Sequence, residues 1–261
     1  MSPDAVAHRP LRVELLEGGA IRRVTLSGGK GNVLDTAMID ALADEVDAAA
    51  SASQVKAVVL DAAGEHFSYG ASVEEHLPEA APAMLVRFHG LLRAMLDASV
   101  PFLAAVRGRC LGGGFELVSF CHRVFAHEGA VFAQPELTLG VFAPAASAIL
   151  PERVGPAVAD DLLLTGRSVV AKEAHRLGLV DEVVDDPTAA ALAWARTHLL
   201  PKSASSLRYA TRAARHALSA RVSSTLSDLE RFYVDGLLGT HDGAEGIRAF
   251  LAKRPPHWTD R

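Results

Sequence analysis

The chain has 261 residues, of which 49% are hydrophobic and 22% are charged. This length allows one large domain, or one domain with a small appendage, around a substantial core. The net charge is −5, and five scattered lysines among 26 basic residues form no basic stripe along one helix. The charge pattern therefore gives no reason to expect a nucleic-acid partner.

The cysteine pattern and the apolar runs bear on the compartment. Cys110 and Cys121 have neither a C-x-x-C partner nor a histidine at zinc spacing, so we expect two buried free thiols, in keeping with a reducing compartment, and no metal site. Met1 to Asp4 lack a basic region followed by an apolar run, so no signal peptide is expected. The apolar runs are shorter than a membrane span. We therefore expect a cytoplasmic protein without a membrane partner.

The first half of the chain alternates short apolar runs with helical patterns. A hairpin is expected around Gly18 and Gly19, and Asp35 is expected to cap the first helix. Repeated strand–helix units imply right-handed crossovers and a mainly parallel sheet. Strands are predicted at 12–16, 21–26, 55–61, 101–106, 123–127 and 131–133, and helices at 36–49, 84–96 and 113–121.

After Pro144 helical patterns dominate. They are predicted at 145–154, 156–165, 171–177, 188–198, 205–220, 225–238 and 242–253, with one strand at 180–184. We interpret this as an α/β core over residues 1–199 followed by a helical C-terminal region over 200–261. Such a helical region often packs against a neighbouring subunit, so oligomerisation is expected.

A glycine run before an acidic residue gives the first sign of chemistry. Gly113 is the middle glycine of three, and Glu116 follows it by three residues. A helix opened by glycines presents backbone N–H groups at its positive end, where a developing oxyanion can be held. The apolar neighbours Phe115 and Leu117 predict a desolvated carboxyl with a raised pKa at Glu116. Glu136, after Gln134 and Pro135, is the second candidate for acid/base chemistry beside a carbonyl.

Together with other segments, these residues form an ordered series that resembles the crotonase superfamily, the enoyl-CoA hydratase and isomerase group, over nearly the whole chain. The matching segments are 30–34 (Lys-Gly-Asn-Val-Leu), 66–71 (His-Phe-Ser-Tyr-Gly-Ala), 101–116, 132–136 (Phe-Ala-Gln-Pro-Glu), 164–166, 174–183 and 245–254. The resemblance implies a crotonase-like α/β fold of repeated ββα units with a helical C-terminal portion. It also implies a homotrimer or homohexamer.

The resemblance also implies roles for single residues. The N–H groups of Ala71 and Gly113 are expected to form an oxyanion hole for the thioester oxygen of an acyl-CoA. Glu116 and Glu136 match the glutamates that activate water and move a proton. Since coenzyme A is part of the substrate, no separate cofactor is expected. The residues expected to bind substrate or coenzyme A are Lys30, Asn32, Val33, Ser68, Gly70, Phe142, Pro144, Phe250 and Lys253.

Two departures from the general hydratase pattern favour one branch of the family. Ser72 stands where those enzymes have aspartate, and Pro144 stands where they have a glycine whose N–H helps to hold the attacking water. Proline has no N–H to donate. Segments 67–78, 88–90 and 140–142 resemble the cyclohexa-1,5-diene-1-carbonyl-CoA hydratases.

For this branch, Phe142, Phe67 and Tyr69 could shape a pocket for a ring, with His76 and His89 as polar pocket residues. Core aromatic residues and satisfied histidines are the alternative interpretation. The leading hypothesis is therefore a hydratase of a conjugated dienoyl-CoA. The alternatives are a general 2-enoyl-CoA hydratase or isomerase on open-chain substrates, and a non-catalytic module that binds acyl-CoA, RNA or a protein.

Overall fold

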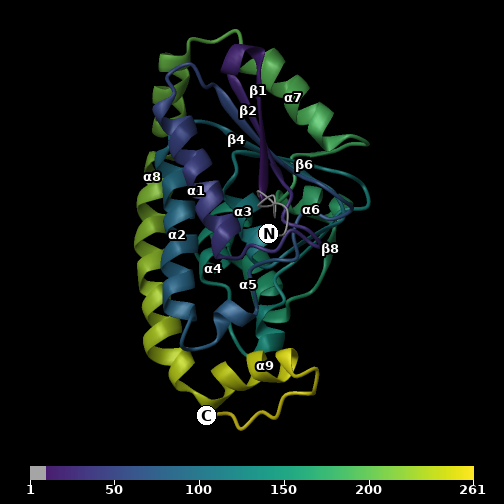
Figure 1. The fold of residues 1–261 in the computed structure, drawn as a ribbon, viewed down its shortest axis with the longest axis vertical. Helices are drawn as coiled ribbons and strands as arrows, with labels where there is room; N and C mark the ends of the chain where they lie inside the picture. The colour runs from purple at the N-terminus through teal and green to yellow at the C-terminus, as the bar shows by residue number, and fades with distance from the viewer. Residues whose placement is uncertain (1–9) are drawn as a thin grey trace, which may run out of the picture.

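The computed structural model describes residues 10–261; the expectation about the first four residues lies outside them. A six-stranded sheet forms the centre of the fold (Figure 1). Its first two strands pair antiparallel and the others pair parallel, which confirms the mainly parallel sheet. In spatial order the strands are β1 (Leu11–Leu16), β2 (Ile21–Leu26), β3 (Ala57–Ala62), β4 (Phe102–Val106), β6 (Arg123–Ala126) and β9 (Glu182–Val183).

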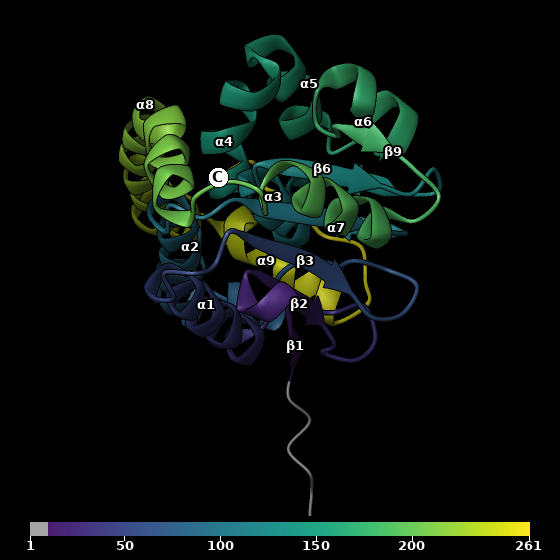
Figure 2. The same cartoon turned by 90° about the horizontal axis from the view of Figure 1, so that it is seen from above.

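Alternate residues of each central strand point to opposite sides of this sheet, and apolar side chains on both sides are covered by other elements. On β3, Ala57 and Val59 pack with helix α7 (Pro187–His198). Val58 and Leu60 belong to the larger core on the other face. Helices α1 (Thr36–Ser51), α2 (Ala81–Asp97) and α8 (Ala204–Arg231) lie side by side along one flank of the molecule (Figures 1 and 2).

A smaller sheet has three strands, and the chain runs from these strands into the helices at the centre of the molecule. It comprises β5 (Arg109–Leu111), β7 (Val131–Ala133) and β8 (Val169–Val170). The sequence prediction missed β5, which runs directly into the glycine run, and β8, which has only two residues. The helices that follow these segments are α3 (Gly113–Phe120), α4 (Pro144–Val154), α5 (Pro156–Thr165) and α6 (Ala171–Leu177).

The C-terminal helices differ from the prediction in one place. Instead of helices at 205–220 and 225–238, the chain forms the single 28-residue helix α8. The buried residues Val222 and Leu226 lie one turn apart, so the apolar face continues through the polar residues between them. A π-helical turn η4 (Phe232–Gly236), a 3₁₀ turn η5 (Leu237–Gly239) and helix α9 (His241–Leu251) complete this region.

The C-terminal region shares the core of the α/β part. Val222, Leu226, Tyr233 and Ile247 belong to the same hydrophobic cluster as the residues of α1 to α4. The boundary near residue 200 therefore does not separate two cores. The expected role of this region in subunit assembly stays a prediction.

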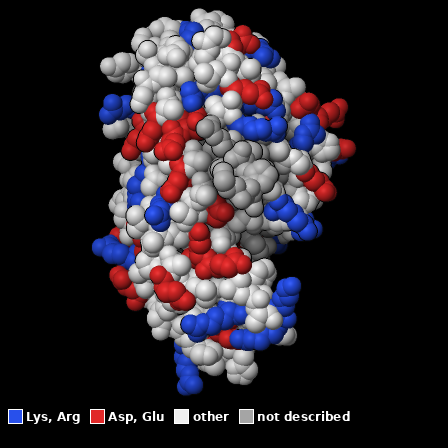
Figure 3. Space-filling model, viewed as in Figure 1, with Lys and Arg blue, Asp and Glu red and all other residues white. Residues whose placement is uncertain are grey.

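Other expectations concern single residues and the surface. Asp35 caps α1 by accepting a hydrogen bond from the Met38 N–H at 2.9 Å, as predicted. Cys110 and Cys121 are buried free thiols, which confirms that prediction. Among residues 10–261 no helix is both long enough and apolar enough to cross a bilayer. Basic and acidic side chains are interspersed over the face seen in Figure 3.

Candidate active site

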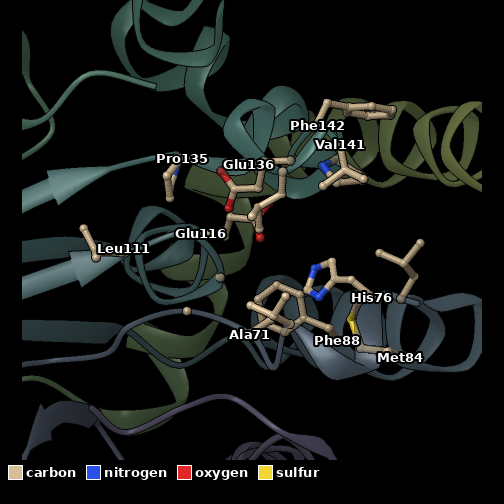
Figure 4. A pocket seen from close by; sticks show the side chains of 18 of the residues that line it. Ala71, His76, Met84, Phe88, Leu111, Glu116, Pro135, Glu136, Val141 and Phe142 are labelled. Carbon is tan, nitrogen blue, oxygen red and sulfur yellow. The ribbon is translucent and has the colours of Figure 1, made fainter. Parts of the chain in front are cut away.

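A cavity of about 420 Å³ opens beside the N-terminus of α3 and is largely apolar. Figure 4 shows Glu116 and Glu136 facing each other across its upper part, with Ala71 and Phe88 below them. Its lining residues are Tyr69, Gly70, Ala71, Val73, His76, Met84, Leu85, Phe88, His89, Arg109, Leu111, Gly112, Gly113, Glu116, Pro135, Glu136, Thr138, Leu139, Val141, Phe142, Ala143, Pro144, Tyr233 and Phe250.

Two backbone N–H groups meet at the floor of this cavity. A Cβ atom placed on Gly113 would lie 3.1 Å from the Ala71 nitrogen, so the two segments touch at this point. Gly70 has a φ of +102°, a left-handed conformation that favours glycine. Among the described residues, neither the Ala71 nor the Gly113 N–H has a hydrogen-bond partner. Two free donors side by side are suited to hold one oxyanion.

The loop that carries Ala71 is fixed by buried hydrogen bonds. The Ser68 hydroxyl donates to the Asn32 carbonyl at 2.8 Å and accepts from the Gly70 N–H at 3.0 Å. The Asn32 amide donates to two carbonyl oxygens of the neighbouring loop, both at 3.0 Å. In the bridge between Leu34 and Ala71, Leu34 forms hydrogen bonds with the residues on either side of Ala71. The Ala71 N–H takes no part in these bonds. Asn32 and Ser68 therefore hold the loop from behind and do not line the cavity.

Glu116 lies in the first turn of the fully buried helix α3. Its Oε1 accepts a hydrogen bond from the Ala146 N–H, in the first turn of α4, at 2.8 Å. Burial raises the pKa of Glu116 to about 7, and hydrogen bonds from the Ala146 and Ala145 N–H groups oppose this rise. The N-terminus of α4 therefore faces the carboxyl group of Glu116.

Glu136 begins the 3₁₀ turn η3 (Glu136–Leu139) and reaches the N-terminus of α3 from the other side. A Cβ on Gly112 would lie 2.7 Å from Glu136 Oε1, so only glycine leaves room for the carboxyl there. With its amide nitrogen turned to this carboxyl, Gln134 donates to both oxygens at 3.0 Å. Burial and then the charge of Glu116 raise the pKa of Glu136 to about 8.

The raised pKa values predict a pH-dependent stability. Between the ordinary carboxyl value of 4.5 and the raised values, the folded chain binds more protons at Glu116 and Glu136 than the unfolded chain does. The stabilisation is thus complete at low pH and is lost as the pH rises through the raised values. From about pH 5 to about pH 8, we expect wild type to lose on the order of 1 kcal/mol or more relative to a Glu116→Gln/Glu136→Gln variant.

Chemical denaturation at a series of pH values measures this difference. The double variant is the control because each glutamine has the size of the glutamate it replaces but cannot titrate. Parallel stability curves for the two proteins would show that the carboxyl pair has ordinary pKa values.

The turn that carries Glu136 is packed directly against the C-terminal segment. A Cβ on Gly140 would lie 2.6 Å from the Asp242 carbonyl oxygen, and one on Gly246 would collide with the Leu139 carbonyl oxygen. Trp258 also lies close to both of these glycines. The position of Glu136 thus depends on the close approach of α9 and the residues after it.

Tyr233 is a cavity residue that the sequence prediction missed. It comes from η4 and is 1% exposed, and its ring centroid lies 5.4 Å from that of Phe142. Its hydroxyl is among the buried side-chain atoms of the described region that have no hydrogen-bond partner. In the sequence, a tyrosine on the apolar face of a helix indicates only core packing.

Both predicted pocket histidines line the cavity and each has one bonded nitrogen. His76 Nδ1 lies 2.7 Å from the Ser72 carbonyl oxygen. His89 Nδ1 lies 2.8 Å from Glu230 Oε1, which also accepts from Arg93 at 3.0 Å. These contacts support the interpretation of satisfied histidines, although the His89 Nε2 atom has no partner among the described residues.

The other predicted site residues fall into three groups. Tyr69, Gly70, Phe142, Pro144 and Phe250 line the cavity. Phe67 lies in the core. The residues expected to contact coenzyme A outside the cavity are exposed or half-buried, and their role stays a prediction: Lys30, Val33 and Lys253.

Comparison with known proteins places this fold and site in a class. The model of the enoyl-CoA hydratase/isomerase family matches residues 17–261. The chain belongs to this family, the crotonase group, and the prediction of a crotonase-like fold and an enoyl-CoA hydratase-type enzyme is confirmed at that level.

Three proteins of this family are similar to the chain over most of its length. The cyclohexa-1,5-dienecarbonyl-CoA hydratase of Thauera aromatica is 48% identical over 98% of this chain and 99% of its own length. The 2,3-dehydroadipyl-CoA hydratase of Escherichia coli is 33% identical over 88% of this chain and 91% of its own. An enoyl-CoA hydratase/isomerase structure from Pseudoalteromonas atlantica is 30% identical, with a TM-score of 0.83, over 96% of this chain and all of its own.

Proposed function

We propose that the chain hydrates a conjugated cyclic dienoyl-CoA thioester of the cyclohexa-1,5-diene-1-carbonyl type. The observation that carries the chemistry is the meeting of the buried carboxyl group of Glu116 and the half-buried one of Glu136 above a pair of free backbone N–H groups. The similarity to the Thauera aromatica enzyme favours the cyclic substrate. Acyl-CoA is accordingly the proposed partner.

The N–H pair of Ala71 and Gly113 supports the first step. A thioester oxygen placed between these donors would gain negative charge as electrons move from the conjugated carbon–carbon bonds towards the carbonyl. Fixed donors stabilise that charge without reorganisation during the reaction, because the loop and the helix are already held by buried hydrogen bonds. The positive end of α3 acts in the same direction.

The carboxyl pair supports the transfer of protons. One carboxylate accepts a proton from water as the water oxygen bonds to the conjugated carbon, and the other carboxyl group delivers a proton to carbon. A carbon–carbon π bond is thus replaced by one C–O and one C–H bond. Because backbone N–H groups favour the ionised form of Glu116, and Glu116 disfavours that of Glu136, we assign the base to Glu116 and the acid to Glu136.

The walls of the cavity support an apolar acyl group. Met84, Leu85 and Phe88 of α2 form one side, and Val141 and Phe142 form the other. Figure 4 shows Phe88 and Met84 from one helix facing Val141 from the opposite side. These side chains offer a ring contacts on both faces and little competition from polar groups.

Substrate preference tests this proposal. We expect kcat/KM for cyclohexa-1,5-diene-1-carbonyl-CoA to exceed that for crotonyl-CoA by at least about tenfold, about 1.4 kcal/mol of differential transition-state binding. The same preparation is used for both reactions. The first is followed by the loss of the dienoyl absorbance, and the second by the loss of the enoyl thioester absorbance.

The other outcomes separate the alternatives. A preference for crotonyl-CoA would identify a general 2-enoyl-CoA hydratase. If the protein binds both thioesters measurably but converts neither, the result favours an isomerase or a non-catalytic binding module.

A further inference from the structure

The Tyr233 hydroxyl is a buried polar group without an explanation in the chemistry described above. It lies in the wall of the catalytic cavity and lacks a hydrogen-bond partner among the described residues. A buried hydroxyl without a partner is unfavourable, so such groups usually meet a water or ligand. Burial, with a further contribution from the charges of Glu136 and Glu116, raises the pKa of Tyr233, so the phenol stays protonated and can donate.

The first turn of α4 offers no N–H group from Pro144 or Ala146 to a water between the two carboxyl groups. Ala146 uses its N–H to hold Glu116, and Pro144, the first residue of this helix, lines the cavity without an N–H. A water that directs its two hydrogens to Glu116 and Glu136 has its oxygen lone pairs free. That oxygen needs a donor from another element.

We propose that the Tyr233 hydroxyl donates a hydrogen bond to the attacking water and fixes it between Glu116 and Glu136. This inference rests on the proposed hydratase function. Three groups from three parts of the chain then hold the water: one from α3, one from η3 and one from η4. Donation to the oxygen leaves both water hydrogens directed at the carboxyl groups, and one lone pair remains for attack on carbon.

The surroundings of Tyr233 hold its ring and the turn that carries it. Its ring packs against Phe142 on one side. Three residues earlier, Glu230 accepts hydrogen bonds from His89 and Arg93 of α2, which ties the end of α8 to that helix. The π-helical turn that follows begins from this anchored point.

Replacement of Tyr233 by phenylalanine tests the role of the hydroxyl in catalysis. We expect kcat to fall about 10- to 100-fold, the range for one lost interaction with the reacting water, and KM to change little. Tyr209→Phe is the matched control, because Tyr209 lies on α8 with 77% of its surface exposed. If kcat is unchanged, or if substrate affinity and thermal stability fall along with kcat, the role of Tyr233 is packing alone.

A crystal structure with cyclohexanecarbonyl-CoA, a saturated thioester that cannot be hydrated, tests the water directly. We expect one water within hydrogen-bond distance of the Tyr233 hydroxyl and both carboxyl groups in wild type, and its loss in Tyr233→Phe. An unchanged water in the variant, or none in wild type, would overturn the inference. If wild type hydrates no thioester but holds this water, the proposed function fails and the water site stands.

Discussion

The Glu136→Gln variant is expected to turn over its substrate about 100-fold more slowly than wild type, or worse, because a positioned general acid typically contributes 10²- to 10⁴-fold. Glutamine has the same shape as glutamate but cannot deliver a proton at neutral pH. The Glu116 carboxyl and its hydrogen bond from the Ala146 N–H stay in place in this variant.

Steady-state kinetics with a thermal-unfolding control separate this loss from misfolding. Glu128→Gln makes the same chemical change at an exposed position between β6 and β7, and we expect it to keep wild-type rates. Binding of the saturated thioester should stay within a few-fold for Glu136→Gln, since the role proposed for this residue is the transfer of a proton. A turnover equal to wild type would remove Glu136 from the mechanism.

Loss of the Gly113 N–H is expected to reduce turnover about 10²- to 10³-fold, the usual effect of one missing oxyanion donor. Gly113→Pro deletes this donor. Gly113 is the first residue of α3, a helix position that tolerates proline because its N–H has no intrahelical partner. The helix can therefore form in the variant while the oxyanion hole has one donor fewer.

Gly113→Ala is the matched control for crowding. Both side chains add a Cβ about 3.1 Å from the Ala71 nitrogen, but alanine keeps the N–H. We expect the alanine variant to lose a smaller part of the activity as the loop shifts by a few tenths of an ångström. Equal rates for the two variants would place the oxyanion away from Gly113.

The two candidate catalytic glutamates could be predicted because each carries a local signal. Glu116 follows a glycine run and has apolar neighbours, and these features predicted its helix, its burial and its raised pKa. For Glu136 the segment from Gln134 to Gly140 gave a weaker pattern. Its closeness to Glu116 is created by β5, β7 and the turn after them, which no local pattern describes.

Contacts between distant segments account for what the sequence did not predict. Ala71 has no chemical signal of its own, and only the family resemblance suggested a role for it. Its N–H lies beside Gly113 because the two segments approach each other in the folded chain. Tyr233 was missed for the same reason, since the π-helical turn places it in the wall of a cavity that is lined by residues from far earlier in the sequence.

The close packing of Gly246 against Leu139 has a consequence for biosynthesis. The turn that starts at Glu136 can settle only when α9 lies against it, and α9 leaves the ribosome after every other helix and strand of the described chain. The sheet and its flanking helices can form earlier, as domains often fold from their N-terminal side during synthesis. We therefore expect a nascent chain to form its sheet before the turn that carries Glu136 is fixed, and we expect no hydration activity from a chain that ends before α9.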